Sequence, residues 1–107
     1  MSINFWIAGS KYVVIFGKYK FNGQLSCSGK YIKITDNSDW FSSLVHEIEE
    51  MVRVERYTRF YSNAGSKDYL FNYNHTEFSV MAEDTAGILR QIMPQLSKKK
   101  KEELFNA

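Results

Sequence analysis

A histidine and several glutamates lie in one short apolar segment, Leu44 to Val52, and their types and spacing could hold a metal ion. The segment reads H-E-I-E-E from His46 to Glu50. Residues four apart in a helix lie on the same face one turn apart, so the side chains of His46 and Glu50 would point the same way. The two histidines of a helical H-E-x-x-H zinc motif have this spacing, but here a glutamate replaces the second one. A solvated acidic stripe with an incidental histidine would give the same pattern.

The other histidine of the chain, His75, supplies a third candidate ligand. If two predicted helices pack antiparallel, His75 can approach His46 and Glu50. Two imidazoles and one carboxylate form many catalytic zinc sites that keep an open position for water, and the same set suits ferrous iron. Glu47 would then stand beside the bound water as the general base. Taken alone, His75 is better explained as a residue at a helix start, and three carboxylates remain alternative ligands: Glu49, Glu77 and Glu83.

The apolar pattern predicts the helices that must position these residues. Residues 36–39 offer several helix N-caps, and the apolar period is helical over 40–60. A second helix is predicted over 75–93 and is stopped by Pro94. The segment 61–74 has no steady period and predicts a loop, in which three aromatic residues could form a short extended piece: Tyr69, Phe71 and Tyr73.

The first third of the chain predicts strands. Residues favourable to strands gather in 3–7, 11–16, 24–27 and 30–35, with glycine-containing turns between them. We therefore expect an α+β domain in which a small antiparallel β-meander packs on two antiparallel helices. The apolar stripe of the first helix should meet that of the second, namely Phe41, Leu44, Ile48 and Val52 against Phe78, Met81, Thr85 and Ile88.

Composition indicates one domain over residues 1–107, ending in a basic C-terminal tail from about residue 96. The chain has 14 lysines and arginines against 12 aspartates and glutamates, and the excess lies mostly in the run Lys98 to Lys101. Nucleic-acid binding needs basic residues on the body of the domain, so we expect no nucleic-acid partner. We expect the lysine run to be solvated and give it no function.

The single cysteine, Cys27, permits no internal disulfide and fits a reducing compartment. It could be a thiol nucleophile, although a small core residue explains it better. No apolar segment approaches the length of a membrane span. We therefore expect a cytoplasmic protein with no membrane partner.

The run from Gly23 to Leu89, about two thirds of the chain, resembles a family of small phage and prophage proteins of the minimal zincin type. The family pattern is a β-hairpin, then H-E-I-x-H or H-E-I-x-E on a helix, then a loop and a histidine that opens the next helix. Four segments carry this pattern here: Gly23 to Cys27, Tyr31 to Ile34, Leu44 to Glu50, and His75 to Glu83. The resemblance implies a metallopeptidase-like fold, with a base at Glu47 and metal ligands at His46, Glu50 and His75.

Glu50 departs from the histidine of the commoner motif. A carboxylate lowers the net positive charge of the site, which makes the metal a weaker Lewis acid and its bound water harder to deprotonate. With His75 as the third ligand, the total of two nitrogens and one carboxylate would be restored.

Two functions from different classes follow. The first is a zinc-dependent hydrolase, for which a small peptidase that acts on a peptide or protein is the best candidate. In it, Glu47 would activate a water molecule bound to zinc or to another divalent metal such as iron. The second is a non-catalytic phage accessory or protein-interaction module that keeps the zincin-like scaffold and uses the tyrosine-rich loop as a contact surface. The sequence leaves the oligomeric state open.

Overall fold

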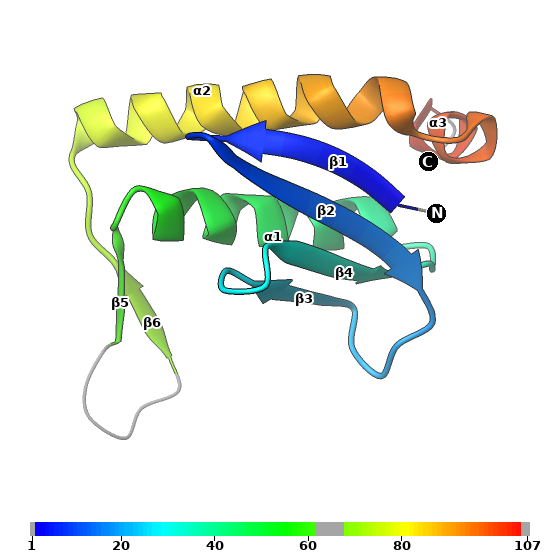
Figure 1. Ribbon diagram of the computed structural model, residues 1–107, viewed down its shortest axis with the longest axis horizontal. Coiled ribbons are helices and arrows are strands. Elements are labelled where there is room, and N and C mark those ends of the chain that lie inside the picture. The colour runs from blue at the N-terminus through cyan, green and yellow to red at the C-terminus, as the bar shows by residue number, and fades with distance from the viewer. Residues whose placement is uncertain (1, 62–67, 106–107) are drawn as a thin grey trace.

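The computed structural model describes residues 2–61 and 68–105 and has the α+β fold that the sequence predicts. Its elements follow one another along the chain as Figure 1 shows. They are β1 (Ser2–Ile7), β2 (Ser10–Gly17), β3 (Gly23–Ser26), β4 (Tyr31–Thr35), α1 (Trp40–Glu55), β5 (Arg59–Tyr61), β6 (Tyr69–Phe71), α2 (His75–Ile92), the 3-10 turn η1 (Met93–Gln95) and α3 (Lys98–Phe105). None of the helices in these described ranges is long and apolar enough to cross a membrane.

The four-stranded sheet is mixed, so the prediction of a wholly antiparallel meander was wrong in this respect. The strand order is β1-β2-β4-β3, and β2 pairs with β4 in parallel, with Val14 opposite Ile32. The other two pairings are antiparallel. β4 buries Ile32 and Ile34 completely and takes a central position, whereas the short β3 has one large apolar residue, Leu25, and takes the edge.

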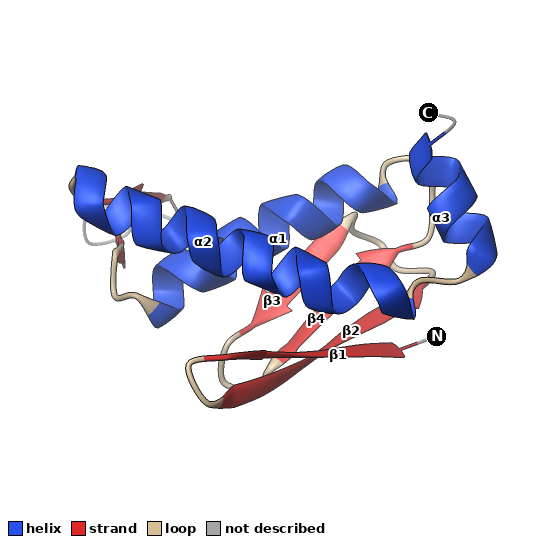
Figure 2. Ribbon diagram, turned by 90° about the horizontal axis from the view of Figure 1, so that it is seen from above, coloured by secondary structure: helices blue, strands red, loops and turns tan. Residues whose placement is uncertain are grey.

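One face of this sheet carries the core. Strand residues alternate between buried and exposed, as a sheet covered on one side requires. Figure 2 shows α1 and α2 on the same side of the strands, crossing each other, and Figure 1 shows that they run in opposite directions. The helices and the sheet together bury a single apolar cluster whose largest members include Phe5, Tyr12, Ile32, Leu44, Ile48, Met51, Met81, Ile88 and Ile92.

The helix stripes match the prediction except at one end. Leu44, Ile48 and Met81 are fully or almost fully buried, but Phe78 exposes 48 % of its surface. α1 ends at Glu55 rather than near residue 60, so the first turns of α2 extend past it (Figure 1). The start of α2 therefore lacks the helical cover that the longer predicted helix would have supplied.

A left-handed residue follows the end of α1. Tyr57 has φ +58°, and the backbone N–H of the next residue, Thr58, donates to Arg53 O at 2.8 Å. The chain then turns into the β5–β6 hairpin, in which Phe60 lies opposite Leu70. The segment predicted as a loop with a short extended piece at Tyr69 to Tyr73 thus contains a strand, β6, while residues 62–67 lie outside the described residues.

The C-terminal lysine run lies in α3 and is solvated only in part. Lys98 and Lys99 are exposed as expected, but Lys100 is only 5 % exposed. Its ammonium group lies 4.5 Å from the ring centroid of Phe16 and 4.6 Å from that of Trp40, and it pairs with Asp36 at 2.6 Å. Because its long stem can pack on apolar surface while its charge meets two rings and a carboxylate, a lysine can be buried here.

The outer edge of the sheet at β1 is covered by two glutamines near the end of α2. Gln91 accepts from Trp6 N at 2.8 Å and donates to Trp6 O at 2.9 Å. Gln95, in η1, makes the same pair with Asn4, at 3.2 and 2.7 Å. The two glutamines can reach alternate residues of β1 because four residues of helix and two residues of strand both span roughly 6 Å.

Candidate functional site

His46 and Glu50 share one face of α1, as their spacing predicts. The Nε2 atom of His46 lies 3.9 Å from Oε2 of Glu50, and the histidine side chain is 73 % exposed. The other carboxylate oxygen of Glu50, Oε1, accepts a hydrogen bond at 2.8 Å from Nη1 of Arg59 on β5. A protein cation therefore already neutralises the carboxylate that was predicted to bind metal. No local pattern signals this pairing, because the helical period continues through residue 59.

His75 is the first residue of α2, and its ring lies 6.4 Å from that of Phe78. Tyr73, two residues earlier, lies beneath the guanidinium group of Arg53, 5.3 Å from ring centroid to Cζ. Arg53 is seven residues beyond His46, which is roughly 10 Å along a helix. The chain thus passes Arg53 just before α2 begins, about two turns of α1 beyond His46.

The described residues do not bring the predicted ligand set together. In the part of the chain that the structure describes, no group of three or more His, Cys, Asp or Glu side chains could hold a metal ion. This covers His46, Glu50 and His75 as well as the alternative ligands Glu49, Glu77 and Glu83. Glu77 instead completes a capping box at the start of α2 by accepting from Asn74 N.

Glu47, predicted as the general base, is buried in a polar pocket. It is only 8 % exposed, and the pocket between α1 and the turn before β3 is lined by Asn22, Gly23, Ser42, Ser43, His46 and Glu47. Burial raises the pKa of Glu47, the nearby Glu50 raises it further, and His46 opposes the shift. None of the described residues donates a hydrogen bond to this carboxylate. An acid of this kind is common at binding and catalytic sites.

Gly23 makes room for Glu47. A Cβ atom at position 23 would lie 3.0 Å from Cγ and 3.1 Å from Oε1 of Glu47, closer than ordinary van der Waals contact. Any larger residue at position 23 would therefore force the Glu47 side chain to shift. Spacing within the sequence does not indicate this contact, since it joins two elements through tertiary packing.

Cys27 is half-buried just after β3. Burial raises the pKa of its thiol, which keeps it protonated and weakens it as a nucleophile. This supports the expectation of a packing role.

The β5–β6 hairpin projects away from the helices and the four-stranded sheet (Figure 1). It has three residue pairs, and the cross-strand pair Phe60 and Leu70 exposes 51 % and 54 % of its surface. Phe71, next to Leu70 in β6, is 44 % exposed on the opposite face of the hairpin. We call Phe60 and Leu70 the hairpin surface. The aromatic alternation of β6 is visible in the sequence, but its pairing with Phe60 is not.

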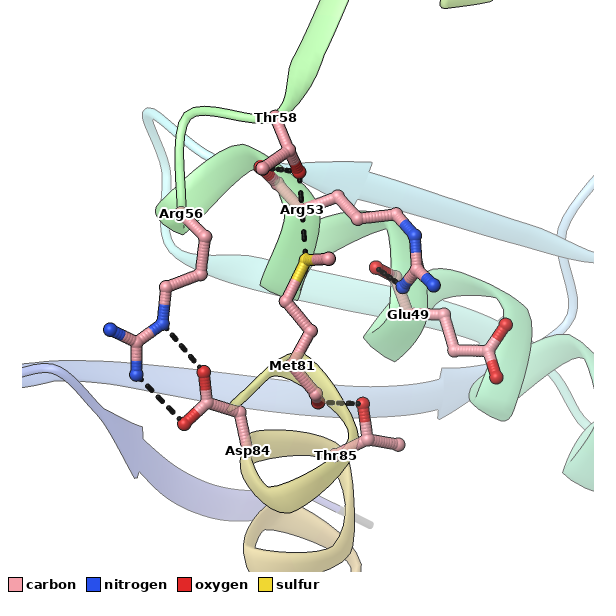
Figure 3. A network of polar contacts seen from close by, with 7 residues as sticks. All are labelled: Glu49, Arg53, Arg56, Thr58, Met81, Asp84 and Thr85. Atoms are coloured by element: carbon pink, nitrogen blue, oxygen red, sulfur yellow. Dashed lines mark hydrogen bonds and ion pairs between the residues drawn. The ribbon is translucent and has the colours of Figure 1, made fainter. Parts of the chain in front are cut away.

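The base of the hairpin is fixed to both helices by the contacts drawn in Figure 3. Arg56 donates two hydrogen bonds to Asp84 of α2, at 2.7 and 2.9 Å, the fork geometry that strengthens an ion pair. Thr58 is 1 % exposed, and its hydroxyl lies 3.0 Å from Arg53 O and 3.6 Å from Sδ of Met81. These contacts fix the segment that leads into the hairpin to α1 and α2.

Comparisons of this chain with protein-family models, with curated proteins and with solved structures found no match.

Proposed function

We propose that this protein is a non-catalytic interaction module that binds an extended segment of a partner protein at the β5–β6 hairpin. The observation that carries the proposal is the exposure of Phe60 and Leu70, which face each other across the hairpin with about half of each surface in solvent. Contiguous apolar groups that remain exposed on a small domain commonly mark interaction sites. We place the protein in the cytosol, where the single Cys27 would stay reduced.

The size of the hairpin supports this proposal. An isolated two-stranded ribbon is marginally stable in water and needs a third strand or a packed face. Among the described strands, β5 and β6 pair only with each other. A partner strand added at one edge would contribute backbone hydrogen bonds, and its side chains would cover Phe60 and Leu70.

The zinc-hydrolase hypothesis stays a prediction from the sequence that this geometry does not support. Glu50 is paired with Arg59, and His75 lies beside Phe78 at the start of another helix. We therefore derive no hydrolytic step for Glu47.

A random-peptide display library tests the proposal even though the partner is not identified. Peptides are selected on the immobilised wild-type protein and then measured against Phe60→Ser/Leu70→Ser and against a control, Trp6→Ser. Trp6 is 57 % exposed but lies on β1, away from the hairpin. Selected peptides should alternate apolar and polar residues, bind the control normally, and lose at least about tenfold in affinity for the double variant, as loss of a central apolar anchor predicts. Peptides that bind the double variant as well as the wild type would overturn the proposal.

Amide hydrogen exchange then tests the binding mode. The amides of residues 59–61 and 69–71 should exchange more slowly in the complex if the peptide joins the hairpin as a strand. Sedimentation of the protein alone decides whether a second copy occupies the same surface, in which case the double variant would be monomeric where the wild type is not. Such self-association would replace the heterologous partner that we propose.

A further inference from the structure

The pocket around Glu47 is separate from the hairpin surface and has features of a built binding site. It lies between the first two turns of α1 and the start of β3 at Asn22 and Gly23, and its lining is predominantly polar. Glu47 is more than nine-tenths buried, and no described residue donates a hydrogen bond to it. Within the described ranges, every side-chain oxygen that is completely buried has a hydrogen-bond partner. The Glu47 oxygens have no such partner, so they are not completely buried and must be accessible from the pocket.

A carboxylate whose side chain is mostly buried loses much of its hydration, which is costly unless a hydrogen-bond donor replaces it. Proteins usually satisfy such a group with arginine, lysine or backbone amides. Here Glu50, one turn away, has its arginine, whereas Glu47 has none among the described residues. The Glu47 carboxylate can therefore accept a hydrogen bond from a donor outside the described chain that enters the pocket.

The chemistry of the lining favours a cation as that donor. Ser42 uses its hydroxyl proton on Asp39 O at 3.1 Å, which leaves its oxygen available as an acceptor. Asn37 already donates to the side-chain oxygen of Asn22 at 3.2 Å. An ammonium or guanidinium group, which offers several donors and no acceptor, would satisfy Glu47 and the hydroxyl oxygens together.

Other ligand classes fit less well. An anion would meet Glu47 and Glu50, and Glu47 lies two turns into α1, where the positive field of the helix start has faded. A divalent metal would lack a cluster of three ligands in the described residues. A neutral hydroxyl compound could donate to Glu47 but would leave its charge unpaired.

We infer that the pocket of Asn22, Gly23, Ser42, Ser43, His46 and Glu47 binds an organic cation, a primary ammonium or guanidinium group, through the Glu47 carboxylate. The group belongs either to a small amine or to a lysine or arginine side chain of another protein. The inference does not depend on the function proposed for the hairpin.

NMR titration tests this inference with defined probes. The ¹⁵N-labelled protein is titrated with n-butylammonium, with a blocked Gly-Lys-Gly peptide, with a blocked Gly-Arg-Gly peptide and with neutral N-butylacetamide. At least one cationic probe should cause saturable shifts at the amides of Gly23, Ser43 and His46, and the neutral probe should not. Tighter binding of a peptide than of the free amine would identify a protein side chain as the source, and the reverse would identify a small amine.

Two matched variants complete the experiment. Glu47→Gln keeps the shape of the side chain and should weaken binding of the cation at least about tenfold, as expected for loss of a charge-assisted hydrogen bond. Glu49→Gln, two residues along on a groove between the helices, should leave affinity unchanged within about twofold. The inference is overturned if no cationic probe saturates, if Glu47→Gln binds as well as the wild type, or if both variants weaken binding equally.

Discussion

Glu47 also has a consequence for stability at the scale of a single residue. Its carboxylate is buried without a hydrogen-bond donor among the described residues, so its ionised form destabilises the folded state. We expect Glu47→Gln to raise the free energy of unfolding at pH 7 by about 1–2 kcal/mol, because a neutral amide costs less to bury than an unpaired charge. Urea denaturation measures this change, with Glu49→Gln as the control that should stay within about 0.5 kcal/mol of the wild type.

The same residue predicts how stability varies with pH. The unfolded carboxyl ionises near its ordinary pKa of 4.5, whereas burial raises the pKa of the folded one. Between these two pKa values the folded state holds more protons, so its stability falls as pH rises through this window and then levels off. The difference in unfolding free energy between Glu47→Gln and the wild type should therefore grow as pH rises above 4.5 and level off above the raised pKa of the folded carboxyl. A difference that is constant across this range would contradict the raised pKa.

Tyr57 adopts a backbone conformation that favours glycine. It has φ +58° and is 87 % exposed, so its ring contributes little packing that would offset the strain. Tyr57→Gly should be more stable than Tyr57→Ala by about 1 kcal/mol, because both remove the ring but only glycine relieves the strain. Thermal denaturation of the two variants makes this comparison, and equal stability would show that the left-handed turn is not strained.

The paired state of Glu50 predicts weak metal binding. Protein purified without a histidine tag should contain no stoichiometric zinc, and added zinc should shift the melting temperature of the wild type and of His46→Ala equally. A stable ligand set would instead stabilise the wild type alone. A zinc-to-protein ratio near one that His46→Ala abolishes would restore the ligand prediction made from the sequence.

At the scale of elements, β1 has a protected edge. Gln91 and Gln95 occupy the backbone groups of Trp6 and Asn4 that a neighbouring strand would otherwise use. Exposed sheet edges are templates for pairing with other chains, so these side chains should keep the sheet from growing.

Replacing both glutamines with alanine tests this role. The amides of Asn4 and Trp6 should exchange at least about tenfold faster in Gln91→Ala/Gln95→Ala, because each loses its acceptor. Light scattering at high concentration should also show more association than for the wild type. Unchanged exchange at both amides would mean that the glutamines do not protect the edge.

The success of the sequence prediction differed from element to element for physical reasons. α2 begins at His75 as predicted, since Asn74 and Glu77 form a capping box and Pro94 limits the other end. α1 ends early at Glu55, where no glycine or proline marks the turn, and residues 57–60 continue an apparent helical period. Capping residues in the sequence thus indicate where α2 starts, whereas the end of α1 depends on the left-handed conformation of Tyr57, which the sequence does not indicate.

The candidate site shows a similar division. The shared face of His46 and Glu50 follows from helix geometry and was predicted correctly. The position of His75 depends on where α2 crosses α1, and the contact of Glu47 with Gly23 depends on how closely β3 approaches the helix. These are tertiary relations that no local pattern contains, as is the parallel pairing of β2 with β4.

At the scale of the whole molecule, α3 closes one end of the domain through Lys100. Lys100→Ala should lower the free energy of unfolding by about 2–3 kcal/mol, because it removes two cation–π contacts, an ion pair and a buried stem. The exposed Lys98 is the matched control, and Lys98→Ala should stay within about 0.5 kcal/mol. Chemical denaturation checks both variants. An equal change in unfolding free energy for the two would show that Lys100 does not stabilise the domain.

The start of β1 and the end of α3 lie at the same end of the domain, and the β5–β6 hairpin lies at the other (Figure 1). A short linker could therefore join residues 105 and 2 in a circular permutant whose new ends are cut elsewhere, a rearrangement that domains with neighbouring termini usually tolerate. A fusion at either terminus would likewise present the hairpin outward. Residues 2 and 105 and the hairpin surface thus lie at opposite ends of the long axis of the domain.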